Sequence, residues 1–305
     1  MDKNYFSKIT ILDGGMGQEL LAKGLKAKGS LWSATALIDK KYHQLVIDAH
    51  LDFIKSGADV IVTSNFSARR TRIIQNKVAE HFNYANKKAG ELALKAKQAS
   101  KKNILIAGSL PAQNDTYIPD ERDKNLIKKD FSDQANLLKP FVNFFYLDVL
   151  SSIREIEIAL NVVEKMNLPV LVGIHIRNNG KLPSGETITE MAEKCKSKNW
   201  LGLIMACVSP EIIEYTVDEI KALEIPFGFK ANLWKEQPRP VGEIVKISED
   251  GFGENPVDVL GTRDDVTAEV FCDFSKRMVD KGATILGGCC ETKPFHIKKI
   301  SSLKN

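Results

Sequence analysis

Near its C-terminus the chain reads ATILGGCC (residues 283–290), a short apolar run followed by two glycines and two adjacent cysteines. The run has the length and apolar character of a buried strand, and the glycines leave the backbone free to turn. Seven similar runs precede it, and each is followed by an amphipathic stretch or a long insertion. Such alternation predicts βα units around a parallel sheet.

The predicted strands are short runs rich in β-branched residues. They cover residues 9–12, 60–63, 104–107, 141–147, 170–174, 201–206, 227–231 and 284–286. Helical periodicity is clear over residues 42–56, 78–99, 151–166, 210–223 and 267–281. An open doubly wound sheet would show fewer strands and a glycine-rich phosphate fingerprint after the first, which DGGMG (residues 13–17) matches only in part. The predicted fold class is therefore α/β, a single (β/α)8 TIM barrel.

The length of 305 residues suits one such barrel, which commonly takes about 250 residues plus insertions. Residues 233–265 are rich in Pro, Gly and charge and are too long for a plain βα loop. We expect them to form an insertion after the seventh strand that passes over the barrel mouth. No linker divides the chain, so residues 1–305 are predicted to form one domain.

Composition excludes several classes of protein. Hydrophobic residues make up 43% and charged residues 27%, and no apolar run approaches the roughly 18 residues of a membrane helix. The net charge of +4 is spread as Lys along helix faces, so we expect no nucleic-acid or membrane partner. The N-terminus lacks the apolar region of a signal peptide, which indicates a cytoplasmic protein. Nothing in the sequence indicates an oligomeric state.

The residues that follow the predicted strands are polar, and in a barrel the active site lies at these C-terminal strand ends. They are Asp13, Asn65, Ser109, Asp148, His175, Cys207, Asn232 and the pair Cys289-Cys290. Three Cys thiolates suit Zn²⁺, and three protein ligands with one open position are typical of a catalytic site. Spacing alone also allows Cys207 to be a core residue and the pair a redox switch. His175 is either a further ligand or a hydrogen-bonding wall residue.

Zinc held by three thiolates carries net negative charge, which disfavours Lewis-acid activation of a carbonyl and favours binding of another soft sulfur. The natural fourth ligand is then a substrate thiol. Coordination would deprotonate a thiol whose free pKa is about 8.5. This chemistry indicates alkyl transfer to sulfur, for which no catalytic residue beyond the zinc site is required.

Six motifs are distributed along almost the whole chain. They are DGGMGQEL (residues 13–20), LWSA (31–34), GADVIVT (57–63), AGSLP (107–111), CVSP (207–210) and GGCC (287–290). Together they resemble the zinc-dependent homocysteine S-methyltransferases, a family that includes the betaine and S-methylmethionine enzymes. The resemblance implies a (β/α)8 barrel and zinc ligation by Cys207, Cys289 and Cys290.

The resemblance also implies a substrate pocket. Asp13 would help to hold homocysteine, with the backbone of Gly14 close to the ligand, although an Asp before two glycines could equally start a turn. The family's Glu on the fourth strand is matched here by Asp148, which is one methylene shorter. Two other positions depart from the family pattern, Ala206 in place of an Asn and Glu291 in place of a Gly. Glu291 would bind a cationic donor group or face solvent.

The methyl donor is expected to be an onium compound, because a methyl group leaves a sulfonium or quaternary ammonium with a neutral leaving group. S-methylmethionine, betaine, dimethylsulfoniopropionate and S-adenosylmethionine all fit this description. Aromatic faces bind such cations, and Trp32 matches a family tryptophan near the donor. Phe66, Tyr117 and Tyr146 could complete an aromatic cage.

The predicted activity is methyl transfer from an onium donor to zinc-bound homocysteine thiolate, which gives methionine. Arg69 or Arg70, after the second strand, could bind a donor carboxylate through bidentate geometry. Two alternatives remain open. One is a non-catalytic zinc-binding or redox-sensing barrel in which Cys289 and Cys290 form a reversible disulfide. The other is a methyltransferase component that takes its methyl group from a corrinoid partner. Selenocysteine as acceptor would leave the same sequence pattern.

Overall fold

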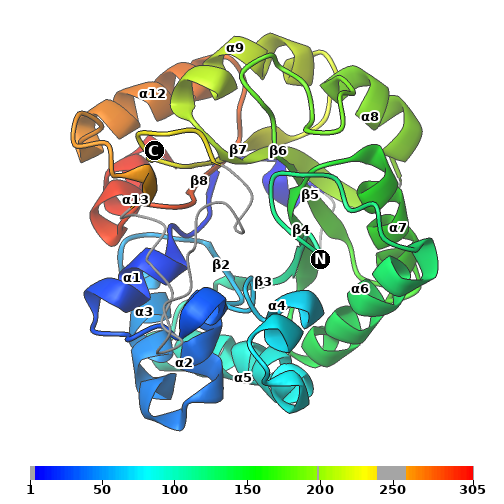
Figure 1. Cartoon of the computed structure of the whole chain (residues 1–305). Coiled ribbons are helices and arrows are strands. Elements are labelled where there is room, and N and C mark those ends of the chain that lie inside the picture. Colours follow the sequence, from blue (N-terminus) through cyan, green and yellow to red (C-terminus); the bar gives the residue numbers. More distant parts are fainter. Residues whose placement is uncertain (1–3, 198, 239–258, 305) are drawn as a thin grey trace.

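A ring of parallel strands forms the centre of the molecule in the computed structural model, which describes residues 4–197, 199–238 and 259–304 (Figure 1). The strands are β1 Thr10–Ile11, β2 Val60–Val62, β3 Leu105–Pro111, β4 Phe144–Leu150, β5 Val170–Ile174, β6 Trp200–Val208, β7 Phe227–Ala231 and β8 Ile285–Gly288. Their order in the 8-stranded sheet is β1-β8-β7-β6-β5-β4-β3-β2. A parallel bridge between Leu12 and Val60 joins the two edges. The predicted α/β barrel is therefore confirmed.

Helices surround this ring on the outside (Figure 1). They are α1 Met16–Ala22, α2 Thr35–Ile38, α3 His43–Lys55, α4 Arg70–Gln75, α5 Phe82–Ser100, α6 Lys124–Leu138, α7 Ile153–Glu164, α8 Ile188–Cys195, α9 Pro210–Lys221, α12 Ala268–Asp280 and α13 Pro294–Ile300. Short 3₁₀ helices cover Tyr5–Ser7, Gly29–Ala34, Lys40–Tyr42, Ala79–His81, Lys139–Phe141 and Ser301–Lys304. The five predicted helices correspond to α3, α5, α7, α9 and α12.

The fourth strand begins later than the sequence suggests. Residues 141–147 were expected to form it, but Lys139–Phe141 is a 3₁₀ helix with Pro140 in its first turn, and β4 starts at Phe144. Proline lacks the N–H that a central strand needs, whereas its fixed φ suits the first turn of a helix. Asn143 then holds the entry to the strand, because its side chain and backbone both bond to the backbone of Ile106.

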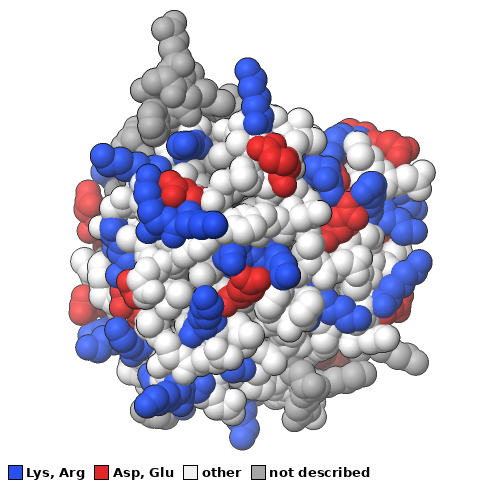
Figure 2. Space-filling view, turned by 90° about the horizontal axis from the view of Figure 1, so that it is seen from below, with Lys and Arg blue, Asp and Glu red and all other residues white. Residues whose placement is uncertain are grey.

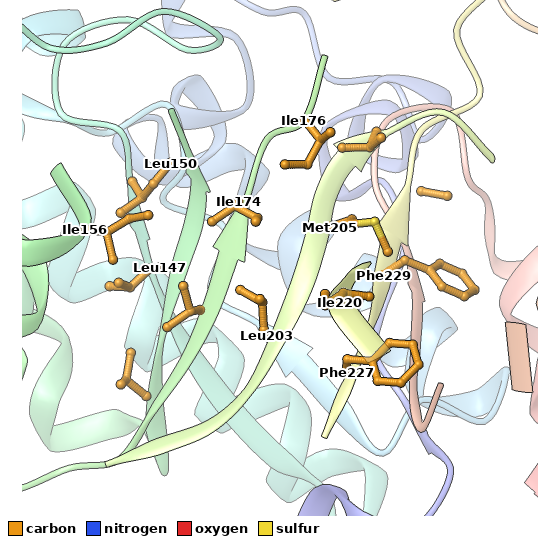
Figure 3. Close-up of a cluster of buried hydrophobic side chains, with 14 of the residues drawn as sticks. Leu147, Leu150, Ile156, Ile174, Ile176, Leu203, Met205, Ile220, Phe227 and Phe229 are labelled. Carbon is orange, nitrogen blue, oxygen red and sulfur yellow. The ribbon is translucent and has the colours of Figure 1, made fainter. Parts of the chain in front are cut away.

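The main apolar core lies between the strands and the outer helices. Figure 3 labels Leu147, Leu150, Ile156, Ile174, Ile176, Leu203, Met205, Ile220, Phe227 and Phe229 within it. Ile156 comes from α7 and Ile220 from α9, so helix side chains interleave with those of the strands. Burying each such side chain contributes about 1.5–3 kcal/mol, which makes the barrel a rigid support for residues at its mouth.

Helix ends are fixed by local hydrogen bonds and by glycine. The Ser152 side chain accepts from the backbone N–H of Glu155 at the start of α7, and Thr187 and Glu190 form a capping box at the start of α8. After α3 and α12 the chain turns at Gly57 and Gly282, with φ of 101° and 106°. These positive angles favour glycine and end both helices close to the next strand.

The segment between β7 and α12 carries the predicted insertion of residues 233–265. Residues 239–258 lie outside the described residues. At its two described ends, Trp234 and Thr262 form an antiparallel bridge, and the Leu233 N–H donates to the Cys290 carbonyl at 3.0 Å. The insertion therefore leaves and re-enters the barrel beside the cysteine pair.

Charges of both signs are interspersed on the face seen in Figure 2. Among the helices that the structure describes, none has the length and apolar character needed to cross a bilayer.

Candidate metal centre and substrate pocket

Three cysteines meet at the mouth of the barrel. Cys207 lies near the end of β6, and Cys289 and Cys290 follow β8 directly. Their Sγ atoms all lie within 4.8 Å of one another, with 3.8 Å between Cys207 and Cys290 and 3.9 Å between Cys289 and Cys290. Of the described residues, only these form such a group. The other cysteines, Cys195 and Cys272, lie on helices outside it.

Backbone irregularity brings Cys207 into this group. Its φ is 54°, and the pairing of β6 with β7 shifts between Ala206 and Val208. A non-glycine residue at positive φ is strained, and such strain is common at functional sites. The Asn232 side chain donates to the Cys207 carbonyl at 2.7 Å, which holds the strained residue in place.

The first sequence motif (residues 13–20) packs directly against the last (residues 287–290) and the residues that follow it. The Gly15 N–H donates to the Thr292 carbonyl at 2.8 Å, and the Gly288 N–H donates to the Asp13 carbonyl at 3.0 Å. A Cβ at position 288 would lie 1.9 Å from Thr292 Oγ1, and one at position 15 would lie 2.6 Å from the Cys289 carbonyl. Glycine is required at both positions because no side chain fits between the two segments.

The three thiols share their protons unequally. Burial raises the pKa of Cys207, but hydrogen bonds from Cys289, Cys290 and Tyr117 outweigh burial and hold that pKa well below its ordinary value. The same hydrogen bonding with Cys207 raises the pKa of Cys290. The Tyr117 hydroxyl lies 3.3 Å from Cys207 Sγ. Three sulfur atoms this close together form a donor set that can hold a soft metal ion.

One pocket contains these cysteines and the four residues named as the predicted substrate site. Asp13, Gly14, Trp32 and Asp148 all line it, together with Phe66, Arg69 and Tyr117. The sequence-based site prediction therefore corresponds to one continuous surface at the barrel mouth. Lys230 and Arg72 also line this pocket, and sequence reasoning missed both.

Asp13 is buried and bonds to two other strands. Its Oδ2 accepts from the Val62 N–H at 2.7 Å, and its Oδ1 accepts from the Lys230 ammonium at 2.5 Å. Burial raises the pKa of the Asp13 carboxyl, while the charge of Lys230 acts in the opposite direction. The carboxylate thus bonds across the barrel and not to its own turn. A single Lys inside the apolar run FGFKA (residues 227–231) is the signal that could have revealed Lys230, since a buried ammonium needs a counter-charge.

Asp148 lies within β4 and is held by a network of buried polar side chains. The Ser109 hydroxyl donates to Asp148 Oδ2 at 2.8 Å, and the Ser109 N–H donates to Thr63 Oγ1 at 2.9 Å. Thr63 donates in turn to Asn65 at 2.6 Å, and Asn65 to Asn86 at 3.1 Å. Burial, reinforced by the nearby Cys289 sulfur, raises the pKa of Asp148 to about 7.

Trp32 lies in a kink of the 3₁₀ segment Gly29–Ala34, with φ of 44°. Its ring packs on Gly17, where a Cβ would lie 2.6 Å from the ring. Within the part of the chain that the structure describes, its buried Nε1 has no hydrogen-bond partner. The indole therefore contributes an apolar ring to the pocket lining, while its buried Nε1 keeps an unused donor.

His175 contacts the pocket residue Tyr117 but is not itself among the residues that line the pocket. Its ring contacts Tyr117 edge-on, with 4.8 Å between ring centroids, and its Nδ1 lies 3.4 Å from the Ala206 carbonyl. Burial lowers the pKa of His175 to about 4, so the ring is neutral at neutral pH. It is absent from the group of candidate metal ligands among the described residues.

Three sequence-based expectations are not met. Tyr146 is buried outside the pocket lining. Arg70 points away from the pocket, because its guanidinium bonds to Asp130 at 2.9 Å and to Asp133 at 2.5 Å. Glu291 is 4% exposed and accepts from Thr262 at 2.8 Å, so it neither faces solvent nor lines the pocket.

Comparisons with known proteins relate the chain to one enzyme family. The sequence model of the family described as homocysteine S-methyltransferase matches residues 10–303. Homocysteine S-methyltransferase 3 of Arabidopsis thaliana is 24% identical over 96% of this chain and 89% of its own length. Selenocysteine methyltransferase of Astragalus bisulcatus is also 24% identical, over 96% of this chain and 91% of its own.

Solved structures show the same fold. The metallated form of the homocysteine methyltransferase MmuM from Escherichia coli superposes with a TM-score of 0.78 and 19% identity, covering 97% of this chain and 96% of that one. Its apo form gives a TM-score of 0.71 over 98% and 96% of the two chains. The family match spans nearly every described element, from β1 to the C-terminal helices, and the chain belongs to the homocysteine S-methyltransferase family.

Proposed function

We propose that this chain is a zinc-dependent homocysteine S-methyltransferase, with Cys207, Cys289 and Cys290 as the zinc ligands. The observation that carries the proposal is the approach of three Sγ atoms to within 4.8 Å of one another in the wall of the substrate pocket. Bound there, zinc would lower the pKa of a coordinated substrate thiol, so that the nucleophile is a thiolate at neutral pH.

Asp13 and Asp148 would bind the amino-acid part of homocysteine. Both carboxylates line the pocket, and each is fixed in orientation by hydrogen bonds to neighbouring strands. The backbone at Gly14 would approach the ligand closely. A Cβ at this position would lie 2.7 Å from both the Phe53 ring and the Thr292 carbonyl, so the chain is tightly packed behind the ligand.

Trp32 and Phe66 would offer ring faces to the methyl donor, an onium compound of the S-methylmethionine, betaine or dimethylsulfoniopropionate type. The homocysteine thiolate would displace the methyl group in line, giving methionine and the demethylated donor. The leaving group is neutral, so no general acid is needed. Trp32 and Phe66 would instead align the two substrates and exclude water.

We further propose that residues 1–305 form one homocysteine-binding domain, supported by the family match over residues 10–303. Its partners would be the two small-molecule substrates. A cytoplasmic location would keep the cysteines reduced and free to bind metal, and all five are free thiols in the structure.

The decisive experiment incubates zinc-loaded protein and homocysteine with each donor separately and measures methionine. Selenocysteine is tested in parallel as acceptor. Cys289→Ser should lose both bound zinc and activity, because two thiolates no longer complete the ligand set. Cys195→Ser and Cys272→Ser are matched controls, since both thiols lie on outer helices, and they should retain zinc.

Two outcomes would contradict this function. Tight zinc binding without turnover of any onium donor would favour the non-catalytic barrel, and turnover only with a methylated corrinoid protein would favour the component of a larger system. Full methyl transfer after exhaustive removal of zinc by a chelator would overturn the mechanism.

A further inference from the structure

Two arginines line the pocket on the side opposite the Cys207 thiol. Arg69 and Arg72 follow β2, and in the closed ring of eight strands β2 lies across the barrel from β6. Their side chains are nearly inaccessible, at 1% and 6% exposure. Buried guanidinium groups are rare unless they are paired, so their partners determine what this side of the pocket can bind.

Arg69 has incomplete hydrogen bonding. Its Nη1 donates to the Ala112 carbonyl at 3.0 Å and to Thr116 Oγ1 at 2.9 Å. Its Nη2 lies 3.8 Å from the Asp115 carboxylate. Among the described residues, its buried Nε has no hydrogen-bond partner. The Arg69 guanidinium therefore keeps donor capacity that these contacts do not use.

The positive charge on this wall is also only partly balanced. Arg72 Nη2 lies 3.5 Å from the same oxygen of Asp115 that faces Arg69, so both guanidinium groups approach one carboxylate. Burial lowers the pKa of Arg69 to about 9, with the charge of Arg72 acting in the same direction. An anionic ligand would offset the cost of burying these charges and would weaken their mutual repulsion.

Arg70, in the same segment, differs because its hydrogen bonds and its charge are satisfied outside the pocket. Its guanidinium bonds to Asp130 and Asp133 and lies 4.0 Å from the Phe82 ring centroid, outside the pocket. Of the three arginines between positions 69 and 72, two therefore line the pocket and one is neutralised outside it.

The arginine wall is next to the aromatic lining and is connected to the thiol of Cys207 through Thr116 and Tyr117. The Arg69 guanidinium lies 5.4 Å from the Phe66 ring centroid. Thr116, which bonds to Arg69, is followed directly by Tyr117, whose hydroxyl contacts Cys207 Sγ. Two adjacent residues of the pocket lining therefore contact the Arg69 guanidinium and the Cys207 sulfur, one each.

We propose that Arg69 and Arg72 form a carboxylate subsite for the methyl donor, so that the donor carries an onium methyl group and a carboxylate in one molecule. This inference rests on the proposed methyltransferase function. The acceptor's amino-acid group is assigned to Asp13 and Asp148, which leaves the arginine wall for the second substrate. The transferred methyl forms a bond to the homocysteine sulfur as its bond to the donor breaks. The bonding electron pair stays on the donor sulfur or nitrogen, and the carboxylate is unchanged.

The test compares donors that differ in the carboxylate. Dimethylsulfoniopropionate is paired with trimethylsulfonium, and glycine betaine with tetramethylammonium. In Arg72→Met, kcat/KM for the carboxylated donor should fall about 100-fold, since a buried charge-assisted contact is lost. The rate with the donor that lacks a carboxylate and the KM for homocysteine should stay near wild-type values. Arg70→Met is the matched control: it also removes a guanidinium from this segment, and although losing the pair with Asp130 should lower stability, the donor preference should stay that of wild type.

Arg69→Met should lower kcat/KM for the carboxylated donor to a similar extent. If the Arg69 variant does not fold, the result for Arg72→Met alone tests the subsite. An unchanged donor preference in Arg72→Met, or a raised KM for homocysteine, would overturn the subsite. Calorimetric binding of each donor without homocysteine separates this inference from the proposed function. Binding that requires both Arg72 and the carboxylate, with no turnover of any onium, would retain the subsite and reject the methyltransferase.

Discussion

The ammonium of Lys230 donates to Asp13 twice, at 2.5 Å to the carboxylate Oδ1 and at 3.1 Å to the backbone carbonyl. Lys230 belongs to β7 and Asp13 follows β1, so the pair reaches across the intervening β8. The second carboxylate oxygen accepts from Val62 on β2. One buried carboxylate thus connects three strands at the barrel mouth, and its orientation toward the pocket is fixed before substrate binds.

Lys230→Met should therefore destabilise the protein by about 3–5 kcal/mol, because it leaves the Asp13 carboxylate buried without its cation. The loss is measured as a lower urea midpoint of the metal-loaded protein. Adding Asp13→Asn should restore part of the stability, as the uncompensated charge is then removed. Lys281→Met breaks an exposed pair with Asp218 and should cost less than about 1 kcal/mol. Equal midpoints for Lys230→Met and wild type would contradict this account of the pair.

The contact between Tyr117 and Cys207 predicts an effect on metal affinity. Groups that bond to a metal ligand typically change affinity about 10–100-fold when removed. Tyr117→Phe should weaken zinc binding about 10-fold, since it deletes the hydroxyl 3.3 Å from Cys207 Sγ and keeps the ring against His175. Competition with a chromophoric chelator measures this change. Tyr215→Phe, at an exposed site, is the control, and an equal affinity in both variants would refute the role of the hydroxyl.

Asp148 provides a test of the acceptor site. Asp148→Asn keeps the shape and can still accept from Ser109, but it loses the negative charge that would bind the homocysteine ammonium. The KM for homocysteine should rise about 10-fold or more, with the KM for the donor unchanged. Asp148→Glu retains the charge and should lie closer to wild type. Normal homocysteine binding by the Asp148→Asn variant would remove Asp148 from the acceptor site.

The barrel could be predicted because its strands are short apolar runs that local sequence identifies. Helix α6 could not, because its buried face includes Asp130 and Gln134 alongside Ile127 and Phe131. Those polar side chains are satisfied inside the protein, Asp130 by Arg70 and Gln134 by Asn86. These polar residues interrupt the apolar periodicity that marks a buried face. Because their partners are distant in sequence, local sequence does not reveal that the residues are buried.

The cysteine group could be predicted from the rule that strand ends converge in a barrel, although 83 positions separate Cys207 from Cys290. Arg72 carries no comparable signal, and the Lys inside the apolar run of residues 227–231 indicates only that Lys230 needs a counter-charge, not which residue supplies it. Asp13 is 217 positions from Lys230, and only the closed ring brings them together. The sequence thus predicts which strand ends meet, while the charge balance between them depends on side-chain packing.

The buried carboxyl of Glu155, in α7, should make the free energy of unfolding depend on pH. Its carboxyl is buried and accepts from the Ser152 hydroxyl at 2.7 Å. Burial raises its pKa to about 7 from an ordinary value of 4.5. The folded state therefore favours the protonated acid, so the stabilising contribution is complete below the unfolded pKa and is lost as pH rises through about 7.

Glu155→Gln should remove this dependence, because the amide stays neutral and can still accept from Ser152. Relative to wild type, the variant should gain about 2.5 kcal/mol of unfolding free energy between pH 5 and pH 8. Urea unfolding of both proteins at the two pH values measures the difference, and every other titrating group contributes equally to the two. Parallel changes in wild type and variant would show that the Glu155 carboxyl ionises in the folded protein as it does in the unfolded chain.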